Sequence, residues 1–387
     1  MPLRHLTVLD IANLGAAPQI AAFFGDFGAR VIKVEPPGGD PLRKLVDQTG
    51  AALQWQIVNR NKQCVTLNLA SSAGRDLFER LLAKSDLLVC ALNATRMRRL
   101  RLDDVQLRPR HPRLVAVDLT TFGTSGPWAD RPGSGTLAEA ASGLASLTGP
   151  PDAPPTLSPV GLGDCVGVLQ GIIAALLGLY GRDTGQAAGS FDVAMYEPLL
   201  GLLSQRIAAT ARDGVEPGRH GNRFPTMAPR NTYRAADGKW VALTAGTDEM
   251  VRRMFELMDR PELSGDPRFG DNRARLAHVD ELDAIIQEWI GTRRAEDVVN
   301  AFAAAGVPLA AVDGLRDVVG NSHFRVRANF VNVDGVTVAA PSPQGSGTTG
   351  RIHHLGRTIG ADNRAVYCQW LGLDEAELQK LQQQGIV

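Results

Sequence analysis

The stretch that decides the fold reads L-T-V-L-D-I-A at residues 6–12, A-P-Q-I-A-A-F-F-G-D-F-G at 17–28 and A-R-V-I-K-V-E at 29–35. The first and last pieces are short β-branched runs, which are typical of buried strands. The middle piece has the apolar spacing of a helix and closes on Gly28, a residue type that commonly follows a helix end. Together the three pieces predict a β-α-β unit, the building block of a parallel sheet.

The same alternation continues along the chain. Further strand candidates are L-L-V-C at 87–90 and L-V-A-V-D-L at 114–119, and a helical segment occupies 73–85. Strands that alternate with helices indicate an α/β fold in which helices cover a parallel sheet. Residues 121–163 are rich in glycine, proline, serine and threonine, so we expect a long loop region with one helix near 137–147. Long ordered loops beside a sheet usually carry function.

Two apolar segments follow this loop region. Residues 164–180 are apolar around nearly the whole circumference of a helix, which predicts a buried helix. Gly167, Gly171 and Ala175 recur every four residues on it and leave room for a close helix neighbour. We expect a second buried helix at about 195–203.

The character of the sequence changes after residue 215, where charged, amphipathic segments replace apolar ones. We therefore expect a large domain that begins with residues 1–224 and a smaller domain at 225–325. Residues 326–387 contain a flexible link and end in a helix whose leucine stripe should dock onto the large domain. A chain of 387 residues is long enough for two cores.

Composition excludes several classes of protein. Lysine plus arginine and aspartate plus glutamate both number 41, so the net charge is zero and no global field would draw the chain to nucleic acid or to an anionic membrane. Neither a signal peptide nor an uninterrupted apolar stretch of roughly 18 residues is evident, so we expect a cytoplasmic protein. The four cysteines lie far apart without a C-x-x-C pair, which argues against disulfides and thiolate zinc sites.

Several common catalytic motifs are absent, namely G-x-x-x-x-G-K-[ST], H-E-x-x-H and G-x-S-x-G. His353 and His354 have no acidic or cysteine companions at ligand spacing, so we expect no metal site. The sequence G-S-G-T-L-A at 133–138 fits a dinucleotide-binding pattern, but it follows proline and a turn instead of a strand.

Asp164 lies in G-L-G-D-C at the start of the long apolar helix, and two interpretations of it are open. An aspartate in this position ordinarily caps the helix by accepting a hydrogen bond from a free amide. Gly161 and Gly163 favour the alternative, because the missing side chains would let another molecule approach the carboxylate, as a nucleophile requires. We expect the amides at the helix start to lower the pKa of Asp164.

Two basic clusters lie near the expected strand ends. They are N-R-N-K at 59–62 and the arginines at 96, 98, 99 and 101. Surface solvation explains such charges in most proteins. Open α/β sheets, however, bind ligands beyond the carboxyl ends of their strands, where a phosphorylated nucleotide would need cations. Both interpretations stay open.

Motifs in a fixed order run through the chain, among them V-L-D-I-A-N-L-G-A-A-P at 8–18, G-A-R-V-I-K-V-E-P-P-G-G-D-P-L-R at 28–43, N-R-N-K-Q-C-V-T-L-N-L at 59–69, F-G-T-S-G-P-W-A-D-R-P-G at 122–133, G-L-G-D at 161–164 and A-P-R-N-T-Y-R-A-A-D-G-K-W at 228–240. In their order and spacing these motifs resemble the family III CoA-transferases. Members of that family include formyl-CoA transferase, carnitine CoA-transferases and α-methylacyl-CoA racemase. The resemblance covers essentially the whole chain.

The resemblance implies a Rossmann-like large domain with a parallel sheet, completed by residues 326–387, plus a smaller α+β domain, in an interlocked ring-like homodimer. It also implies an enzyme that moves coenzyme A from an acyl-CoA substrate to a carboxylic acid without a metal. Asp164 would attack the donor thioester to form an acyl-aspartyl anhydride. The released CoA thiolate would then form an aspartyl-CoA thioester, which the acceptor acid attacks.

The resemblance implies further site residues by family position. Lys62 and Arg99 would contact the CoA nucleotide, and Leu14 would line the pocket near its pantetheine. Arg43 is a further basic candidate. A mobile loop at Gly246, in T-A-G-T-D, would shield the intermediate from water.

The chain also departs from the family pattern. Ala91 begins a stretch that replaces the usual N-F-x-P-G, Ser134 and Gly135 replace an aromatic or histidine followed by an acid, and Glu139 replaces a glutamine. Racemisation needs a proton removed from one face and returned to the other, and the histidine that partners the aspartate in the racemases is missing. CoA transfer is therefore favoured over 2-methylacyl-CoA racemisation. A noncatalytic acyl-CoA-binding homologue is the third alternative.

Overall fold

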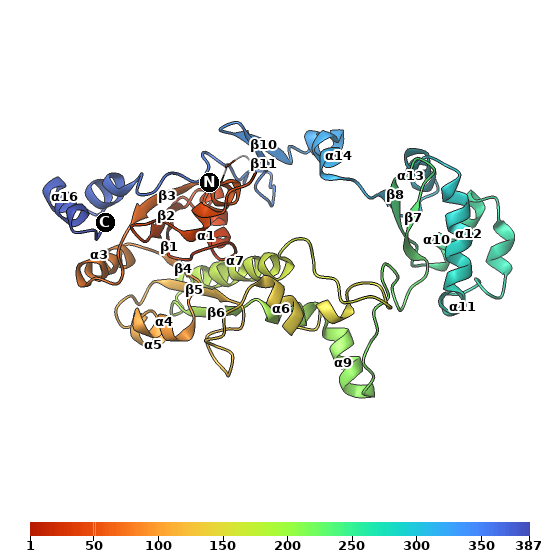
Figure 1. Ribbon diagram of the computed structural model, residues 1–387, viewed down its shortest axis with the longest axis horizontal. Coiled ribbons are helices and arrows are strands. Elements are labelled where there is room, and N and C mark those ends of the chain that lie inside the picture. Colours follow the sequence, from red (N-terminus) through yellow and green to blue (C-terminus); the bar gives the residue numbers. More distant parts are fainter. Residues whose placement is uncertain (49, 51) are drawn as a thin grey trace. The chain divides into compact units, whose positions relative to one another are not determined.

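The computed structural model describes residues 1–48, 50 and 52–387, and a six-stranded parallel sheet organises its N-terminal half (Figure 1). The strands are β1 (Thr7–Asp10), β2 (Arg30–Glu35), β3 (Lys62–Thr66), β4 (Leu87–Cys90), β5 (Val115–Thr120) and β6 (Ser190–Ala194). Their order is β3-β2-β1-β4-β5-β6, and every neighbouring pair is parallel. The sheet confirms the predicted α/β class, although β3 and β6 are absent from the sequence prediction. The strand order reverses between β1 and β4, a kind of switch point at which open α/β sheets bind ligands.

Alternate side chains of the strands face two separate hydrophobic cores. Val8 in β1 packs in the core formed with α1 (Pro18–Asp26) and α7 (Leu162–Asp183). Its neighbour Leu9 packs in the core formed with α3 (Ser72–Ala83) and the C-terminal helix α16 (Glu375–Gln383). This alternation is the two-residue period of a strand that is covered on both faces. The C-terminal helix thus docks on the core of the sheet, as its leucine stripe predicts.

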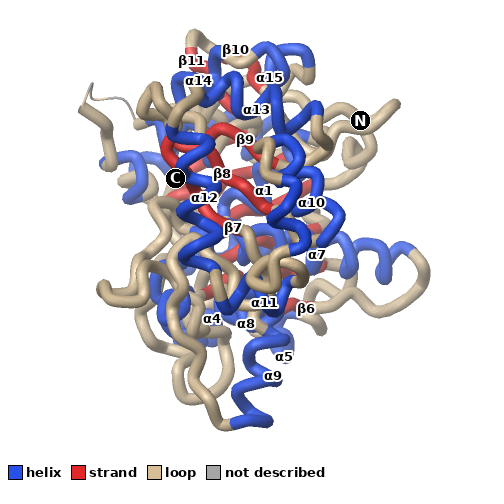
Figure 2. Tube along the Cα trace, turned by 90° about the vertical axis from the view of Figure 1, so that its right-hand side faces the viewer, coloured by secondary structure: helices blue, strands red, loops and turns tan. Residues whose placement is uncertain are grey.

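Short elements fill the connections around this sheet. They are η1 (Pro41–Lys44), α2 (Leu53–Val58), α4 (Ala94–Arg99), α5 (Asp104–Leu107), α6 (Gly135–Ala141), α8 (Tyr196–Leu202), α9 (Ser204–Asp213), the antiparallel pair β10 (Phe330–Val333) and β11 (Val336–Ala339), and the π-helix η4 (Ala365–Trp370). The helix expected near 137–147 is divided into α6 and a 3₁₀ turn, η2 (Ala145–Leu147). Helix α9 has no buried residue and projects away from the sheet (Figure 1 and Figure 2).

Residues 145–156 and 214–322 form a second compact unit, and residues 1–144, 157–213 and 323–387 form the first. The second unit contains a three-stranded antiparallel sheet in the order β7 (Arg230–Arg234), β8 (Trp240–Thr244), β9 (Leu309–Ala311). Its helices are α10 (Asp248–Leu257), η3 (Pro261–Gly265), α11 (Asn272–Ala277), α12 (Val279–Gly291), α13 (Ala295–Ala304) and α14 (Leu315–Gly320), and α15 (Ser322–Val326) spans the boundary with the first unit. The second unit has a hydrophobic core of its own, in which the Tyr233 hydroxyl donates a hydrogen bond of 2.6 Å to Asp283.

Helix α7 confirms the predicted apolar helix but is not buried on all sides. Leu169, Ile173, Leu177 and Tyr180 are spaced three or four residues apart and are 61%, 49%, 60% and 72% exposed. The prediction of complete burial is therefore wrong for the single chain, because apolar side chains face away from the sheet as well as toward it. By length and composition alone α7, which has 22 residues and contains an 18-residue window of mean hydropathy 1.9, is also apolar enough to cross a membrane, a test that buried core helices pass too.

Glycines let the sheet-facing side of α7 approach its neighbours closely. A Cβ at Gly171 would overlap Cδ1 of Ile20 on α1, and one at Gly178 would lie 2.6 Å from side-chain atoms of both Phe191 on β6 and Val115 on β5. Ile20 is fully buried, so it has little room to move aside. At Gly171 and Gly178, the close neighbours of this helix are thus α1 and the sheet itself.

We predict that Gly171→Ala lowers the free energy of unfolding by about 1–3 kcal/mol, the usual range for overpacking a core, although alanine is the better helix former. Gly201→Ala in α8 is the matched control, because a Cβ there would meet no atom within 4 Å. The control should be neutral or stabilising by up to about 1 kcal/mol. Chemical denaturation measures both effects, and equal stability of the two variants would contradict the close packing of α7.

Candidate active site

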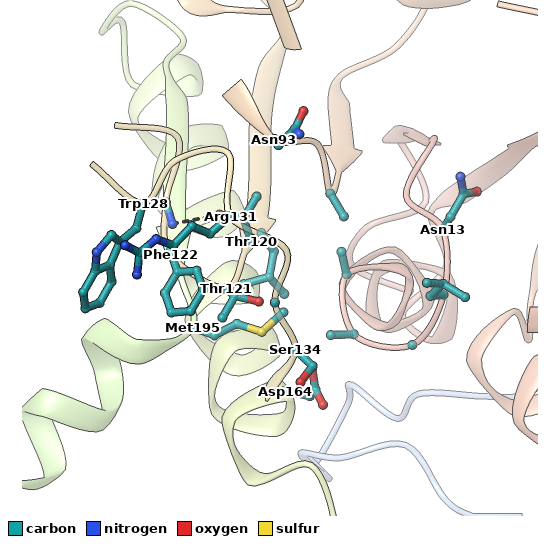
Figure 3. A pocket seen from close by; sticks show the side chains of 18 of the residues that line it. Asn13, Asn93, Thr120, Thr121, Phe122, Trp128, Arg131, Ser134, Asp164 and Met195 are labelled. Carbon is teal, nitrogen blue, oxygen red and sulfur yellow. Dashed lines mark hydrogen bonds between the residues drawn. The ribbon is translucent and has the colours of Figure 1, made fainter. Parts of the chain in front are cut away.

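A cavity of about 440 Å³ opens at the carboxyl edge of the sheet, within the first unit (Figure 3). Residues 13–17 after β1, Ala91 and Asn93 after β4, and residues 121–123 after β5 line it, together with Met195 directly after β6. The cavity thus lies at the strand ends on both sides of the switch between β1 and β4. Open α/β sheets characteristically bind their ligands at this place.

Asp164 lies in the first turn of α7 and lines this cavity. The N-cap residue of α7 is Gly161, and no side chain caps the helix from that position, so the capping interpretation of Asp164 is wrong. Its carboxylate instead accepts a hydrogen bond from the backbone N–H of Gly135, the first residue of α6. Figure 3 shows Asp164 beside Ser134, which directly precedes α6. The carboxylate is therefore both held by the protein and open to the cavity.

At the N-termini of α6 and α7, a carboxylate from each helix binds a backbone amide of the other helix. Glu139 of α6 is buried, and its Oε1 accepts a hydrogen bond of 3.2 Å from the backbone N–H of Gly163 in α7. The amide of Gly135 in α6 serves Asp164 in return. Each acidic side chain thus satisfies an amide of the other helix that has no partner within its own helix.

Three glycines make these reciprocal hydrogen bonds possible. A Cβ at Gly135 or at Gly161 would overlap the side chain of Asp164, and a Cβ at Gly163 would overlap the carbonyl oxygen of Gly135. Glycine at position 135, one of the departures from the family pattern, therefore has a structural reason. Any larger residue there would displace the carboxylate or separate the two helices.

The pKa of Asp164 is raised above its ordinary value. Burial is the largest cause, because it disfavours the ionised form, and the negative charge of Glu139 acts in the same direction. The Gly135 N–H favours the carboxylate but is the weaker influence compared with burial. The expectation that helix-start amides lower this pKa is therefore wrong.

Among the residues implied by family position, Leu14 shares the cavity with Asp164. Its backbone is left-handed, with φ of 64°, a conformation that non-glycine residues rarely adopt, and its side chain is half exposed. Arg43 does not line the cavity. It donates two hydrogen bonds of 2.7 Å to Glu35, and its guanidinium lies 3.7 Å from the centre of the Trp55 ring.

Lys62 is completely buried and is not among the residues that line the cavity. Its ammonium group donates hydrogen bonds to Asp10 (2.7 Å), the carbonyl of Pro18 (2.7 Å) and Asn59 (3.0 Å). Burial lowers the pKa of Lys62 to about 8, against the opposing influence of the Asp10 charge. This placement does not favour direct contact with a CoA nucleotide.

Arg99 and Gly246 lie on other parts of the chain. Arg99 is exposed at the end of α4 and does not line the cavity. Gly246 belongs to the second unit, in the exposed loop between β8 and α10, where a Cβ would lie 2.5 Å from the sulfur of Met227. The roles of both residues stay predictions.

Sequence reasoning missed Arg131. Among the described residues that line the cavity, Arg131 and Asp164 are the two that carry charge. The Arg131 guanidinium lies 4.9 Å from the centre of the Trp128 ring, which packs edge-on against Phe122 (Figure 3). The sequence R-P-G at 131–133 could have indicated this residue, because Arg131 is a cation in a loop region that the sequence predicts to be functional.

The described part of the chain contains no group of three or more His, Cys, Asp or Glu side chains placed to hold a metal ion. The cavity does offer one orphaned polar atom, since the side-chain oxygen of Asn13 is buried there without a partner among the described residues. The site therefore combines one carboxylate and one guanidinium with uncharged amide and hydroxyl side chains and with apolar residues.

Comparison with known proteins places the chain in a family. Residues 3–363 match the sequence pattern of CoA-transferase family III. The chain is 31% identical to a succinyl-CoA–D-citramalate CoA-transferase and 33% identical to the beta subunit of a succinyl-CoA–L-malate CoA-transferase, both from Chloroflexus aurantiacus, over 100% of this chain and 98% of each relative. The crystal structure of a CaiB/BaiF family protein from Brucella suis is similar, with a TM-score of 0.84 and 27% identity over 95% of this chain and 99% of that one.

We predict that Glu139→Gln lowers the pKa of Asp164. The substitution removes a negative charge that stabilises the protonated form, while the new amide oxygen can still accept the Gly163 hydrogen bond. Titration of ¹³C-labelled aspartates by NMR measures the pKa, and Asp164→Asn assigns the signal. Asp130→Asn is the control, because Asp130 is bound to Thr95 and does not contribute to the pKa of Asp164. An unchanged Asp164 pKa in Glu139→Gln would contradict the coupling.

Proposed function

The chain belongs to CoA-transferase family III, and on this premise we propose that it moves coenzyme A from an acyl-CoA thioester to a carboxylic acid through covalent intermediates on Asp164. One observation carries the proposal. The carboxylate of Asp164 faces a cavity at the carboxyl edge of the sheet, and glycines at 135 and 161 leave the room that its side chain occupies. A carboxylate that attacks a thioester needs this access.

The proposed reaction has four steps. Asp164 attacks the donor carbonyl, the C–S bond breaks, and an acyl-aspartyl anhydride and the CoA thiolate result. The thiolate attacks the aspartyl carbonyl and releases the donor acid, which leaves an aspartyl-CoA thioester. The acceptor carboxylate attacks that thioester to give a second anhydride and free thiolate. The thiolate then attacks the acceptor carbonyl, so that the new acyl-CoA leaves and the Asp164 carboxylate is restored.

The residues of the cavity suit these steps. The Gly135 N–H holds the Asp164 carboxylate in one orientation, which reduces the entropy lost on reaching the transition state. Apolar lining residues such as Leu14, Phe122 and Trp128 reduce the access of water, which would hydrolyse an anhydride. Arg131 can pair with a carboxylate or a phosphate of the substrates.

The names of the relatives narrow the proposed substrates. Two relatives are named as enzymes that use succinyl-CoA with D-citramalate or L-malate, so we include a succinyl-CoA donor and a hydroxy dicarboxylic acceptor in the proposal. Arg131 supports acids with a second carboxylate, because it is the cation among the described lining residues. Contact of Arg99 or Arg43 with CoA, shielding of the intermediate by the Gly246 loop, and a cytoplasmic location also belong to the proposal.

Racemisation of a 2-methylacyl-CoA is the weaker alternative. It requires two groups that exchange a proton on opposite faces of the α-carbon. Among the described residues that line the cavity, Asp164 is the one carboxylic acid, and no histidine, cysteine, lysine or tyrosine accompanies it as a second proton-exchanging group. Solvent deuterium uptake into a 2-methylacyl-CoA without CoA exchange would favour racemisation over transfer.

We also propose that the protein is a homodimer in which the exposed face of α7 is covered. Leu169, Ile173, Leu177 and Tyr180 form a continuous apolar stripe on a single chain, and stripes of this kind commonly mark protein interfaces. Helix α9, which has no buried residue of its own, is a further element for the same interface.

We predict that incubation with succinyl-CoA and hydroxylamine converts Asp164 to its hydroxamate, because hydroxylamine attacks both the anhydride and the thioester. Mass spectrometry of the peptide that contains residue 164 detects the product. Asp164→Asn should lose CoA transfer by about a thousandfold or more while it still binds acyl-CoA, whereas Asp130→Asn should keep both. Equal transfer by Asp164→Asn and wild type would rule out the mechanism, and binding without turnover in both proteins would favour the noncatalytic alternative.

A second prediction concerns the oligomer. Light scattering should give twice the 41.4 kDa chain mass for the wild type. The paired change Ile173→Glu and Leu177→Glu should shift the protein to the monomer, because it places charge in the apolar stripe. Val105→Glu on α5 is the control, since Val105 is 82% exposed but lies outside the stripe. A monomeric wild type, or an unchanged mass for the paired variant, would contradict the proposed interface.

A further inference from the structure

Four charged side chains are buried behind the loop that joins β1 to α1. Asp10, Lys33 and Lys62 have no exposed surface, and Asp40 is 1% exposed. Lys62 lies 2.7 Å from Asp10, and Lys33 lies 3.2 Å from Asp40 and 3.9 Å from Asp10. With two carboxylates and two ammonium groups the cluster is electrically balanced. We refer to these four residues as the buried charge cluster.

Both lysines of the buried charge cluster hold carbonyl groups at the ends of the loop. Lys33 donates a hydrogen bond to the carbonyl of Ala12, at the start of the loop. Lys62 donates one of 2.7 Å to the carbonyl of Pro18, the first residue of α1. Residues 13–17 between these two anchors line the cavity beside Asp164.

Both carboxylates hold amide groups of the same loop. Asp10 accepts a hydrogen bond of 3.0 Å from the N–H of Ala12, and Asp40 accepts one of 3.4 Å from the N–H of Leu14. Leu14 has the left-handed backbone conformation, which is strained for a non-glycine residue and persists only where the surroundings enforce it. All four members of the buried charge cluster therefore bind backbone groups of one strained loop.

Stability alone does not account for such a cluster. Removing ions from water is costly, and proteins in which apolar residues replace a buried ion pair are often equally stable or more stable. Apolar side chains, however, could not bind two carbonyl and two amide groups of the loop. The specific consequence of keeping these charges buried is thus the fixed conformation of residues 12–18.

We propose that the buried charge cluster positions the cavity wall at residues 13–17 for the acyl-CoA, with Lys62 and Lys33 as positioning residues that do not touch the substrate. The inference rests on the proposed function, and it assigns Lys62 a role different from the nucleotide contact implied by family position. The loop and Asp164 approach the cavity from different elements, so the cluster acts on substrate binding and leaves the chemical step at Asp164 intact.

The test uses charge-neutral paired variants, so that no buried charge is left without a partner. Asp10→Asn with Lys62→Met removes the anchor at Pro18 and keeps an oxygen for the Ala12 amide. Hydrogen exchange followed by mass spectrometry should show faster exchange of residues 12–17, by about tenfold or more. The KM for acyl-CoA should rise by about tenfold while kcat changes less than about threefold.

Lys33→Met with Asp40→Asn is a second variant, which removes the anchor at Ala12. It should give the same pattern, and it keeps the inference testable if the first pair fails to fold. Asp86→Asn with Arg182→Met is the matched control. This pair is also mostly buried, with a 2.9 Å contact, but it binds no backbone group of residues 12–18. It should leave loop exchange and KM unchanged.

The outcomes separate this inference from the proposed function. Wild-type transfer together with unchanged exchange and KM in the paired variants overturns the positioning role and leaves CoA transfer standing. If the wild type transfers no CoA but the paired variants still show faster exchange of the loop, the positioning of the loop is supported and the proposed function is overturned. A fall in kcat alone, with unchanged KM, also contradicts the inference.

Discussion

Helices α6 and α7 begin in direct contact with each other, and the site depends on how closely their first turns approach. The contact is possible because positions 135, 161 and 163 carry no side chain. Each helix start then offers an amide to a carboxylate of the other helix, Gly135 to Asp164 and Gly163 to Glu139. The arrangement satisfies free amides at the starts of both helices without using Asp164 as the cap of its own helix, and so the carboxylate can face the cavity.

Different interactions fix the opposite wall of the cavity, which residues 13–17 form. Residues 13–17 carry little bulk apart from Asn13 and Leu14, and no regular structure fixes them. Their conformation is set from behind by charged side chains that reach both ends of the loop. One wall is therefore shaped by the absence of side chains and the other by buried charges, and both meet where the strand order reverses between β1 and β4.

The sequence predicted local features well and tertiary ones poorly. The β-α-β pattern at 6–35 and the apolar helix after Asp164 follow from periodicity, which local residues determine. The burial of Lys62 could not be predicted, because N-R-N-K at 59–62 has the composition of a solvated turn and its partner Asp10 lies 52 residues away. The direction of the Asp164 pKa was missed for a similar reason, since Glu139 reaches the site from another helix. Periodicity also cannot distinguish a helix buried in one chain from one covered by a second, so the exposed face of α7 was unexpected.

The raised pKa of Asp164 bears on how a carboxylate serves as a nucleophile. A more basic carboxylate attacks a carbonyl more readily, whereas a higher pKa leaves a smaller fraction of it ionised at a given pH, and reactivity is greatest when the pKa lies near the working pH. Burial and the charge of Glu139 move Asp164 toward greater basicity, and the Gly135 N–H limits the shift. Glutamate at position 139, a departure from the family pattern, is therefore compatible with an active enzyme. It retains the hydrogen bond to Gly163 that joins the two helices, and it adds a charge that raises the pKa of Asp164, the proposed nucleophile.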